Sequence, residues 1–200
     1  MNRIGGGVGR PAGDRIAPGH TLLGMDVVIR RAVTADVTAI RTLIDTYSVE
    51  RRLLSKATVA IYEAVQEFWV AVRAGDGAIV GCGALHVMWE DLAEIRTVAV
   101  DPSARGHKIG HRIVSELLAT AATLGVRRVF CLTFETEFFG SFGFAAIDGA
   151  PVPHKVFEEL LRSYDEGVAE FLDLERVKPN TLGNTRMLLH LDPRSLVDPE

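Results

Sequence analysis

The residues best suited to chemistry lie between Glu94 and Gly110, in the run EIRTVAVDPSARGHKIG. In this run an apolar strand ends at Asp-Pro, and a basic loop that contains glycine leads into an amphipathic helix. The N–H groups at a helix N-terminus lack partners within the helix and lie at the positive end of its dipole. Arg105, His107 and Lys108 add cationic or potentially cationic donors. The run therefore predicts a site for a cofactor that carries phosphate.

The composition is that of one soluble globular domain. The chain has 200 residues, of which 48% are hydrophobic and 24% are charged, and its formal net charge is -4. This slightly negative balance argues against nucleic acid as the main partner. No apolar run is long enough to span a membrane, and the N-terminus lacks the apolar core of a secretory signal. We therefore expect no membrane association and a cytoplasmic location.

The two cysteines, Cys82 and Cys131, lie in separate apolar runs and lack the spacing of metal ligands. Free cysteines of this kind are usually buried. We therefore expect two buried, reduced thiols and no metal site.

Hydrophobic periodicity predicts the elements that position the loop. Residues 1–24 are dense in glycine and proline and are predicted to be disordered, which leaves a domain over 25–192 and a short tail over 193–200. Strands are predicted at 27–31, 68–73, 79–89, 93–100, 126–134, 144–147 and 186–191, and helices at 34–47, 55–65, 109–124 and 156–164, with a short helix after 134. The strand, helix and strand between 93 and 134 imply a parallel pair. The fold class is therefore α/β, with a sheet of mixed strand directions.

Two motifs resemble the GNAT acetyltransferase superfamily. The run from Arg105 to Gly110 is similar to the family's Arg/Gln-x-x-Gly-x-Gly/Ala loop, with Lys108 where most members have glycine. The run FFGSFGF is similar to the family's Phe-Tyr-x-x-x-Gly-Phe segment, with Phe139 in place of the tyrosine that often protonates the departing thiolate. The resemblance implies a mixed, mostly antiparallel sheet whose parallel strand pair is joined by the cofactor-binding helix.

A closer resemblance covers most of the chain. The segments IRTVAVDP, VFCLTFETEFF, SYDEGVAEFLDL and VKPNTLGNTRMLL are similar to those of the short, single-domain amino-acid N-acetyltransferases of actinobacteria. This resemblance implies acetyl transfer from acetyl-CoA to the α-amine of L-glutamate, with L-glutamine also accepted, as the first step of arginine biosynthesis. It also favours a homodimer. Two alternatives stay open: a GNAT enzyme for another small amine or a protein amine, and a non-catalytic acyl-CoA sensor, which the replacements at Lys108 and Phe139 suggest.

The resemblance also implies how the cofactor is held. The backbone of the strand at 98–100 would pair with the pantetheine arm, and one N–H there, assigned to Val100, would act as the oxyanion donor. The cofactor-binding residues are therefore expected to be Val98, Ala99, Val100, Arg105, Gly106, His107, Lys108, Ile109 and Gly110. For His107, phosphate contact and plain solvent exposure are both open.

Acetyl transfer to an amine needs a general base, and Glu94 is the first candidate. It lies on the predicted strand and could act directly or through a water molecule. A solvated charge at the start of the strand is the alternative. Glu135 and Glu137, just beyond the next strand, are further candidates, and His86 has a suitable pKa for the role but is more typical of a satisfied core or rim histidine.

A dicarboxylic substrate needs Arg or Lys, and Arg96 is the first candidate. Residues 94 and 96 should share one face of the strand, so Arg96 could clamp a substrate carboxylate or pair with Glu94. A second polar cluster contains Lys178, Asn180, Asn184 and Arg186. Lys178 and Arg186 are the further substrate-binding candidates, although a plain turn also fits this stretch.

Overall fold

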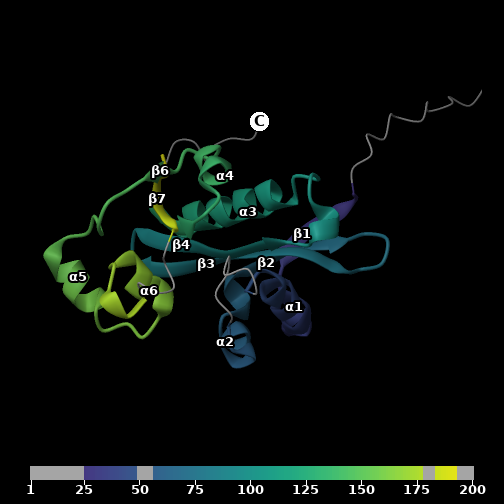
Figure 1. The fold of residues 1–200 in the computed structure, drawn as a ribbon, viewed down its shortest axis with the longest axis horizontal. Coiled ribbons are helices and arrows are strands. Elements are labelled where there is room, and N and C mark those ends of the chain that lie inside the picture. Colours follow the sequence, from purple (N-terminus) through teal and green to yellow (C-terminus); the bar gives the residue numbers. More distant parts are fainter. Residues whose placement is uncertain (1–24, 49–55, 178–182, 193–200) are drawn as a thin grey trace, which may run out of the picture.

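The computed structural model describes residues 25–48, 56–177 and 183–192. In these residues seven strands form one sheet in the order β1-β2-β3-β4-β5-β7-β6 (Figure 1). The strands are β1 (Val27–Arg31), β2 (Phe68–Arg73), β3 (Ile79–Trp89), β4 (Leu92–Val100), β5 (Arg128–Thr133), β6 (Ala145–Ala146) and β7 (Thr185–His190). β4 and β5 run parallel, whereas the other neighbours in the sheet are antiparallel. The predicted mixed sheet with one parallel pair is confirmed.

Helices cover both faces of this sheet. They are α1 (Val37–Ser48), α2 (Thr58–Glu63), α3 (Ile109–Thr123), α4 (Thr136–Gly140), α5 (His154–Leu160) and α6 (Glu166–Phe171). Figure 1 shows α3 and α4 on one face, and α1, α2 and α6 on the other. The sequence pattern did not predict α6, which is only six residues long. Among the described residues no helix is long and apolar enough to cross a membrane.

Two glycines of β3 face helix α3 and leave room for its side chains against the sheet. A Cβ atom on Gly83 would lie 2.8 Å from Ile113 and 3.1 Å from Leu117, and one on Gly81 would lie 2.9 Å from Ile113. Any larger side chain at these two positions would push α3 outward. The glycines therefore fix the height of the helix whose N-terminus follows the predicted phosphate loop.

A bulge in β4 changes which side chains face which layer. Arg96 pairs with Ala84, but Ala99 pairs with Cys82, so β4 carries one extra residue between these two pairs. Thr97 at the bulge has φ +59°, which is rare for a β-branched residue. Even-numbered side chains face α1 and α6 before the bulge, whereas Ala99 packs in the α1 layer after it.

The parallel pairing of β4 with β5 is short. It runs from Leu92 opposite Arg128 to Glu94 opposite Phe130 and goes no further. Both strands continue past this point, and β4 stays paired with β3 while β5 stays paired with β7. The two central strands therefore separate, and the edge of β4 that would have bonded to β5 is left open.

Cys82 and Cys131 are buried free thiols, as predicted. Burial raises the pKa of Cys82 to about 12, and it also raises that of Cys131. Among the described residues no group of three or more His, Cys, Asp or Glu side chains is arranged to hold a metal ion. The predicted tails at 1–24 and 193–200 lie outside the described residues, so the domain boundaries stay predictions.

Candidate active site

A cleft with a volume of about 600 Å³ opens where β4 and β5 separate. Its walls come from β4 beyond the parallel pairing, the loop after β4, the first turn of α3, the end of β5 and helix α4. The lining residues are Tyr47, 95–100, 104–106, 108–111, 132–135, 138 and 139. The fold thus brings the predicted phosphate loop and the open edge of β4 into one space.

The loop enters α3 through two residues in the left-handed region. Gly106 has φ +83° and Lys108 has φ +56°. Lys108 is the N-cap of α3, and its carbonyl accepts a bond from Arg112 N–H at 3.1 Å. The N–H groups of the turn before Arg112 remain outside the helix's own bonding, as at any helix N-terminus. With the helix dipole, they give this end of the cleft a partial positive charge that suits an anion.

The side chains of Arg105 and His107 differ in their relation to the cleft. Arg105 lines it, donates to Tyr47 Oη at 3.1 Å, and has its guanidinium carbon 5.7 Å from the centroid of that ring. Tyr47 in turn donates to the Val100 carbonyl. His107 is absent from the lining, and its Nδ1 lies 3.0 Å from the Arg105 carbonyl oxygen. His107 therefore braces the loop from within.

Gly110 lies where the loop, β4 and α4 meet. A Cβ atom built there would lie 3.4 Å from the Phe138 ring and 3.7 Å from Val100 Cγ2. These are ordinary contacts, so a methyl group would fit and a much larger side chain would enter the cleft. Phe138 also packs edge-to-face on His111, with ring centroids 4.8 Å apart.

Glu94 is buried just beyond the inner end of the cleft. It is 3% exposed and does not itself line the cleft, whereas its neighbours Ile95 and Arg96 do. Its Oε2 is buried with no hydrogen-bond partner among the described residues, and it lies 3.7 Å from Arg96 Nη1. Burial raises the pKa of the Glu94 carboxyl, and the charge of Arg96 offsets only part of that rise. The group is therefore a buried carboxyl of increased basicity whose Oε2 accepts no hydrogen bond from the described residues.

Arg96 is held between two other carboxylates. Its Nη1 donates to Asp165 at 2.9 and 3.0 Å, and its Nη2 donates to Glu67 Oε2 at 3.0 Å. Glu67 Oε1 lies 2.7 Å from His86 Nδ1. Burial opposes ionisation of both carboxyls. His86 and Arg96 nevertheless keep the pKa of Glu67 below its usual value, and Arg96 does the same for the pKa of Asp165. Arg96 and Glu94 share a face of β4, as predicted. Arg96 also forms ion pairs with Glu67 and Asp165.

Comparison with known proteins decides the family. A profile of the Acetyltransferase (GNAT) family matches residues 37–144, more than half of the chain. The chain belongs to the GNAT acetyltransferase family. Membership makes it an acetyltransferase, and acetyl-CoA is the acetyl donor of GNAT enzymes.

Individual relatives agree with this assignment. An amino-acid acetyltransferase of Mycobacterium tuberculosis is 62% identical over 165 residues, which are 82% of this chain and 94% of the relative. The crystal structure of Rv2747 from Mycobacterium tuberculosis, in complex with CoA and NLQ, matches with a TM-score of 0.80 and 62% identity over 82% of this chain and 99% of that one. An N-acetylglutamate synthase from Neisseria gonorrhoeae, complexed with coenzyme A and N-acetyl-glutamate, matches with a TM-score of 0.66 at 23% identity, over 84% of this chain and 35% of that one. The last of these supports the fold alone.

The GNAT cleft of this chain fits acetyl-CoA. The partial positive charge at the α3 N-terminus, together with Arg105 and Lys108, suits the pyrophosphate. The open edge of β4 over Val98, Ala99 and Val100 offers backbone groups for the amides of the pantetheine arm. Lys108, where most members of the family have glycine, adopts the left-handed conformation that glycine takes more easily.

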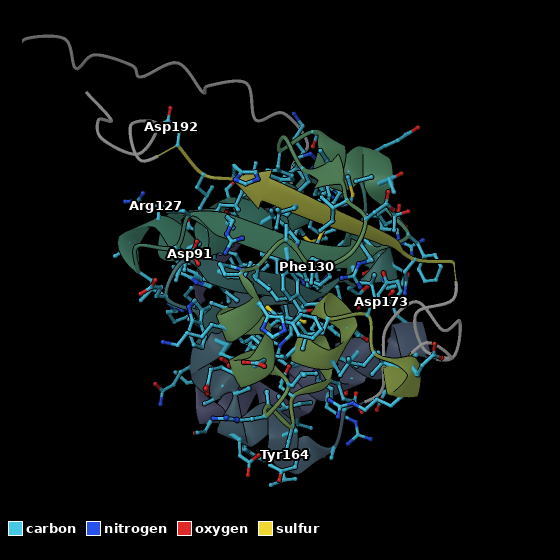
Figure 2. The ribbon with its side chains drawn as sticks, turned by 90° about the vertical axis from the view of Figure 1, so that its left-hand side faces the viewer. Asp91, Arg127, Phe130, Tyr164, Asp173 and Asp192 are labelled. Carbon is cyan, nitrogen blue, oxygen red and sulfur yellow. The ribbon has the colours of Figure 1, made fainter. Side chains whose placement is uncertain are left out.

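The predicted substrate-binding residues lie in different settings. Arg96 lines the cleft. Arg186 lies on β7 and donates to the carbonyls of Glu170 and Phe171 at the end of α6, and to that of Gly149 at 3.2 Å. Its guanidinium carbon is 5.4 Å from the centroid of the Phe130 ring, which Figure 2 shows from the side of α5 and α6. Arg186 thus has a structural set of partners and is absent from the cleft lining.

Two further candidates, Lys178 and Asn180, lie outside the described residues. Asn184 is described and is partly buried just before β7. Substrate contact by Lys178 and Arg186 stays a prediction.

The other base candidates are less well placed than Glu94. Glu135 lines the cleft but is exposed, and Glu137 is exposed and absent from the lining. His86 has its Nδ1 bonded to Glu67, which is the role of a satisfied rim histidine. Glu94 alone among these four combines burial with a free acceptor oxygen.

Sequence reasoning missed three acidic residues near Glu94. They are Glu67 before β2, Asp165 at the N-cap of α6, and Glu170 within α6. Glu170 is 8% exposed, and burial together with the charge of Glu94 raises its pKa to about 7. The run Asp-Glu-Gly-Val before an apolar stretch could have indicated the N-cap. No local signal links Glu67 or Glu170 to the site.

Proposed function

We propose that this chain transfers the acetyl group of acetyl-CoA to the α-amine of L-glutamate or L-glutamine, as the first step of arginine biosynthesis. The observation that carries the proposal is a cleft suited to acetyl-CoA whose inner end lies beside Arg96 and the buried carboxyl of Glu94. The 62% identical relative is named an amino-acid acetyltransferase, which supports an amino acid as the acceptor. A cytoplasmic location and a homodimer stay predictions.

In this proposal acetyl-CoA supplies an acetyl group activated as a thioester. Backbone groups make most of the contacts that bind it. The N–H groups at the start of α3 hold the pyrophosphate, with Arg105 and Lys108 beside them. The open edge of β4 aligns the pantetheine arm, and the N–H of Val100 is our candidate for the oxyanion donor.

Glu94 acts as the general base. The carboxylate accepts a proton from the acceptor ammonium, directly or through a water molecule, and the amine nitrogen then attacks the acetyl carbonyl carbon. As the new C–N bond forms, the C–S bond breaks and sulfur leaves with its electron pair, while the nitrogen loses its second proton to a water molecule and becomes the amide nitrogen. Phe139 has no proton to donate. CoA can depart as a thiolate because a thiol pKa is about 8.5.

Cationic side chains would recognise the carboxylates of the acceptor. Arg96 is the candidate that lines the cleft, and it would add a substrate carboxylate to its contacts with Glu67 and Asp165. Lys178 and Arg186 are the further candidates from the sequence. Such cationic side chains suit the carboxylates of a free α-amino acid better than a peptide acceptor.

Release of free CoA thiol tests the proposal. The purified full chain receives acetyl-CoA with each member of a panel of amino acids, polyamines and lysine-containing peptides, at neutral and mildly alkaline pH. Turnover with glutamate or glutamine and with no polyamine or peptide is the expected result. Turnover confined to peptides or polyamines would contradict an amino-acid acceptor. Tight acetyl-CoA binding without any turnover would favour a non-catalytic acyl-CoA sensor.

A further inference from the structure

The Arg96 guanidinium is closest to two carboxylates other than that of its neighbour Glu94. Arg96 Nη1 lies 2.9 Å from Asp165 Oδ2 and Nη2 lies 3.0 Å from Glu67 Oε2, whereas the approach to Glu94 Oε2 is 3.7 Å. The first two distances are those of charge-assisted hydrogen bonds and the third is too long for one. An arginine two residues from a buried carboxylate would otherwise be its natural partner.

We propose that Asp165 and Glu67 are positioning residues that hold the Arg96 guanidinium away from Glu94 and so keep a Glu94 oxygen free to accept the substrate proton. The inference rests on the proposed role of Glu94 as the base. A carboxylate that accepted two hydrogen bonds from arginine would be a weaker base and would have its lone pairs occupied. Competition for one guanidinium therefore sets the basicity of Glu94.

Helix α6 secures this arrangement through its first turn. Asp165 is the N-cap of α6 and accepts the Val168 N–H at 3.1 Å, so the carboxylate that holds Arg96 is itself fixed. The same turn contains Gly167, where a Cβ atom would overlap Glu94 Oε2 and would lie 2.9 Å from Glu94 Cδ and 3.0 Å from Asp165 Oδ1. Only glycine leaves room for both carboxyls. The helix thus covers the Glu94 carboxyl with Gly167 and supplies the competing carboxylate with Asp165.

Some of the charges around Glu94 raise the pKa of its carboxyl and others lower it. The groups that influence its carboxyl, or that it influences, come from every layer packed against it: Lys56, His86, Arg96, Cys131, Asp165 and Glu170. Burial and the Asp165 charge raise the Glu94 pKa, while Arg96, His86 and Lys56 lower it. Removal of the Asp165 charge has two effects of the same sign, because it removes a negative neighbour and frees Arg96 to bond to Glu94.

The test is the variant Asp165→Asn, with Asp91→Asn as the matched control. Asparagine is as good an N-cap as aspartate, so α6 keeps its cap and loses only the charge. Asp91, labelled in Figure 2, also accepts two hydrogen bonds from an arginine, from Arg128 Nε at 3.0 Å and Nη2 at 3.1 Å. It is not among the residues that line the cleft. The side-chain carboxyls are followed by NMR of protein with ¹³C-labelled glutamate across pH, with the Glu94 signal assigned from Glu94→Gln.

Asp165→Asn is expected to lower the Glu94 pKa by about one unit or more, since an opposite charge in contact lowers a carboxyl pKa by about 1–3 units. The acidic limb of the kcat/KM profile should move to lower pH by the same amount. Glu67→Gln should shift both in the same direction, and Asp91→Asn should shift neither. A Glu94 pKa that is unchanged in both Asp165→Asn and Glu67→Gln would overturn the inference.

Two controls separate this inference from the proposed function. If Glu94→Gln keeps the acidic limb, Glu94 is not the base and the proposed mechanism fails, whatever the titration of Asp165→Asn. If Glu94→Gln abolishes the acidic limb while Asp165→Asn leaves it at the same pH, only the inference fails.

Gly167→Ala provides a second variant, because a methyl group there displaces the Glu94 carboxyl. It should lower kcat with little change in the KM for acetyl-CoA, and unchanged kcat would contradict the role assigned to α6.

Discussion

The two ends of the cleft are built in different ways. The end that suits acetyl-CoA is built largely from one stretch of the chain, from Val98 to Gly110, and it works through backbone N–H groups and a helix dipole. At the other end, Arg96 lines the cleft and is paired with Glu67 and Asp165 from distant parts of the chain. The buried Glu94 lies next to Arg96, so this end works through coupled charges. A backbone site should tolerate substitutions that keep its shape, and Lys108 has the left-handed φ that glycine favours. A site of coupled charges should be sensitive to each member.

The largest effect is expected from Glu94→Gln. Removal of the base should lower kcat by about 10²- to 10⁴-fold at neutral pH, with partial recovery at higher pH as more of the amine loses its proton in solution. The KM for acetyl-CoA should be nearly unchanged, since Glu94 lies beyond the inner end of the cleft. Steady-state kinetics across pH give both values. The exposed Glu137→Gln is the control, and a fall of the same size there would contradict the assignment.

The next effect is expected from Arg96→Ala, which leaves Asp165 and Glu67 without their guanidinium. The Arg96 side chain is 12% exposed, and removal of one partner from a buried ion pair costs about 3–5 kcal/mol of folding free energy. Urea unfolding should show this loss, and the KM for glutamate should rise much more than that for acetyl-CoA. Equal changes in the two KM values would remove Arg96 from the acceptor end.

Glu170→Gln tests whether the charges at the acceptor end oppose each other. The Glu170 pKa is about 7 in the folded protein against 4.5 for a free glutamate, so the folded state holds this proton more tightly than the unfolded state. The protein should therefore lose stability as the pH rises from about 4.5 through about 7, and the loss should then level off. Glu170→Gln should remove that loss and stabilise the protein by on the order of 2 kcal/mol at pH 8.

Denaturant unfolding at pH 5 and pH 8 measures the Glu170 effect. Glu166, on the same helix, has an exposed side chain, and Glu166→Gln should change the pH dependence much less. A wild-type protein that is equally stable at both pH values would show that Glu170 is ionised at little cost.

The smallest effect is expected at the cofactor end, with Gly110→Ala. The added methyl group meets Phe138 and Val100 at ordinary contact distances, so acetyl-CoA affinity should fall by less than about tenfold, or 1.4 kcal/mol. Gly110→Trp would fill the cleft and should abolish measurable binding by calorimetry. Gly75→Trp, in open space on the β2–β3 hairpin, is the control. Unchanged affinity in Gly110→Trp would contradict the assignment of the loop.

The same contrast explains what could be predicted from the sequence. The strand, the loop and the helix from 94 to 124 were predicted because their signals are local, and the shared face of Glu94 and Arg96 follows from the two-residue period of a strand. The ion pairs of Arg96 could not be predicted, since its partners lie 29 and 69 residues away along the chain. The contacts of Arg186 with the end of α6 could not be predicted either, because they depend on a helix that the sequence pattern did not indicate.

The bulge at Thr97 also lacked a local signal, since a β-branched residue rarely adopts positive φ. The division of β4 into faces limits how far the length of this strand can change. Deletion of one residue between Leu92 and Arg96 would turn part of the 92, 94, 96 face toward α3 and carry a carboxylate or a guanidinium into an apolar layer. Homologous chains should therefore share the length of β4 and vary in length at the hairpin between Arg73 and Ala78, where each extra residue adds only to a solvent-exposed turn.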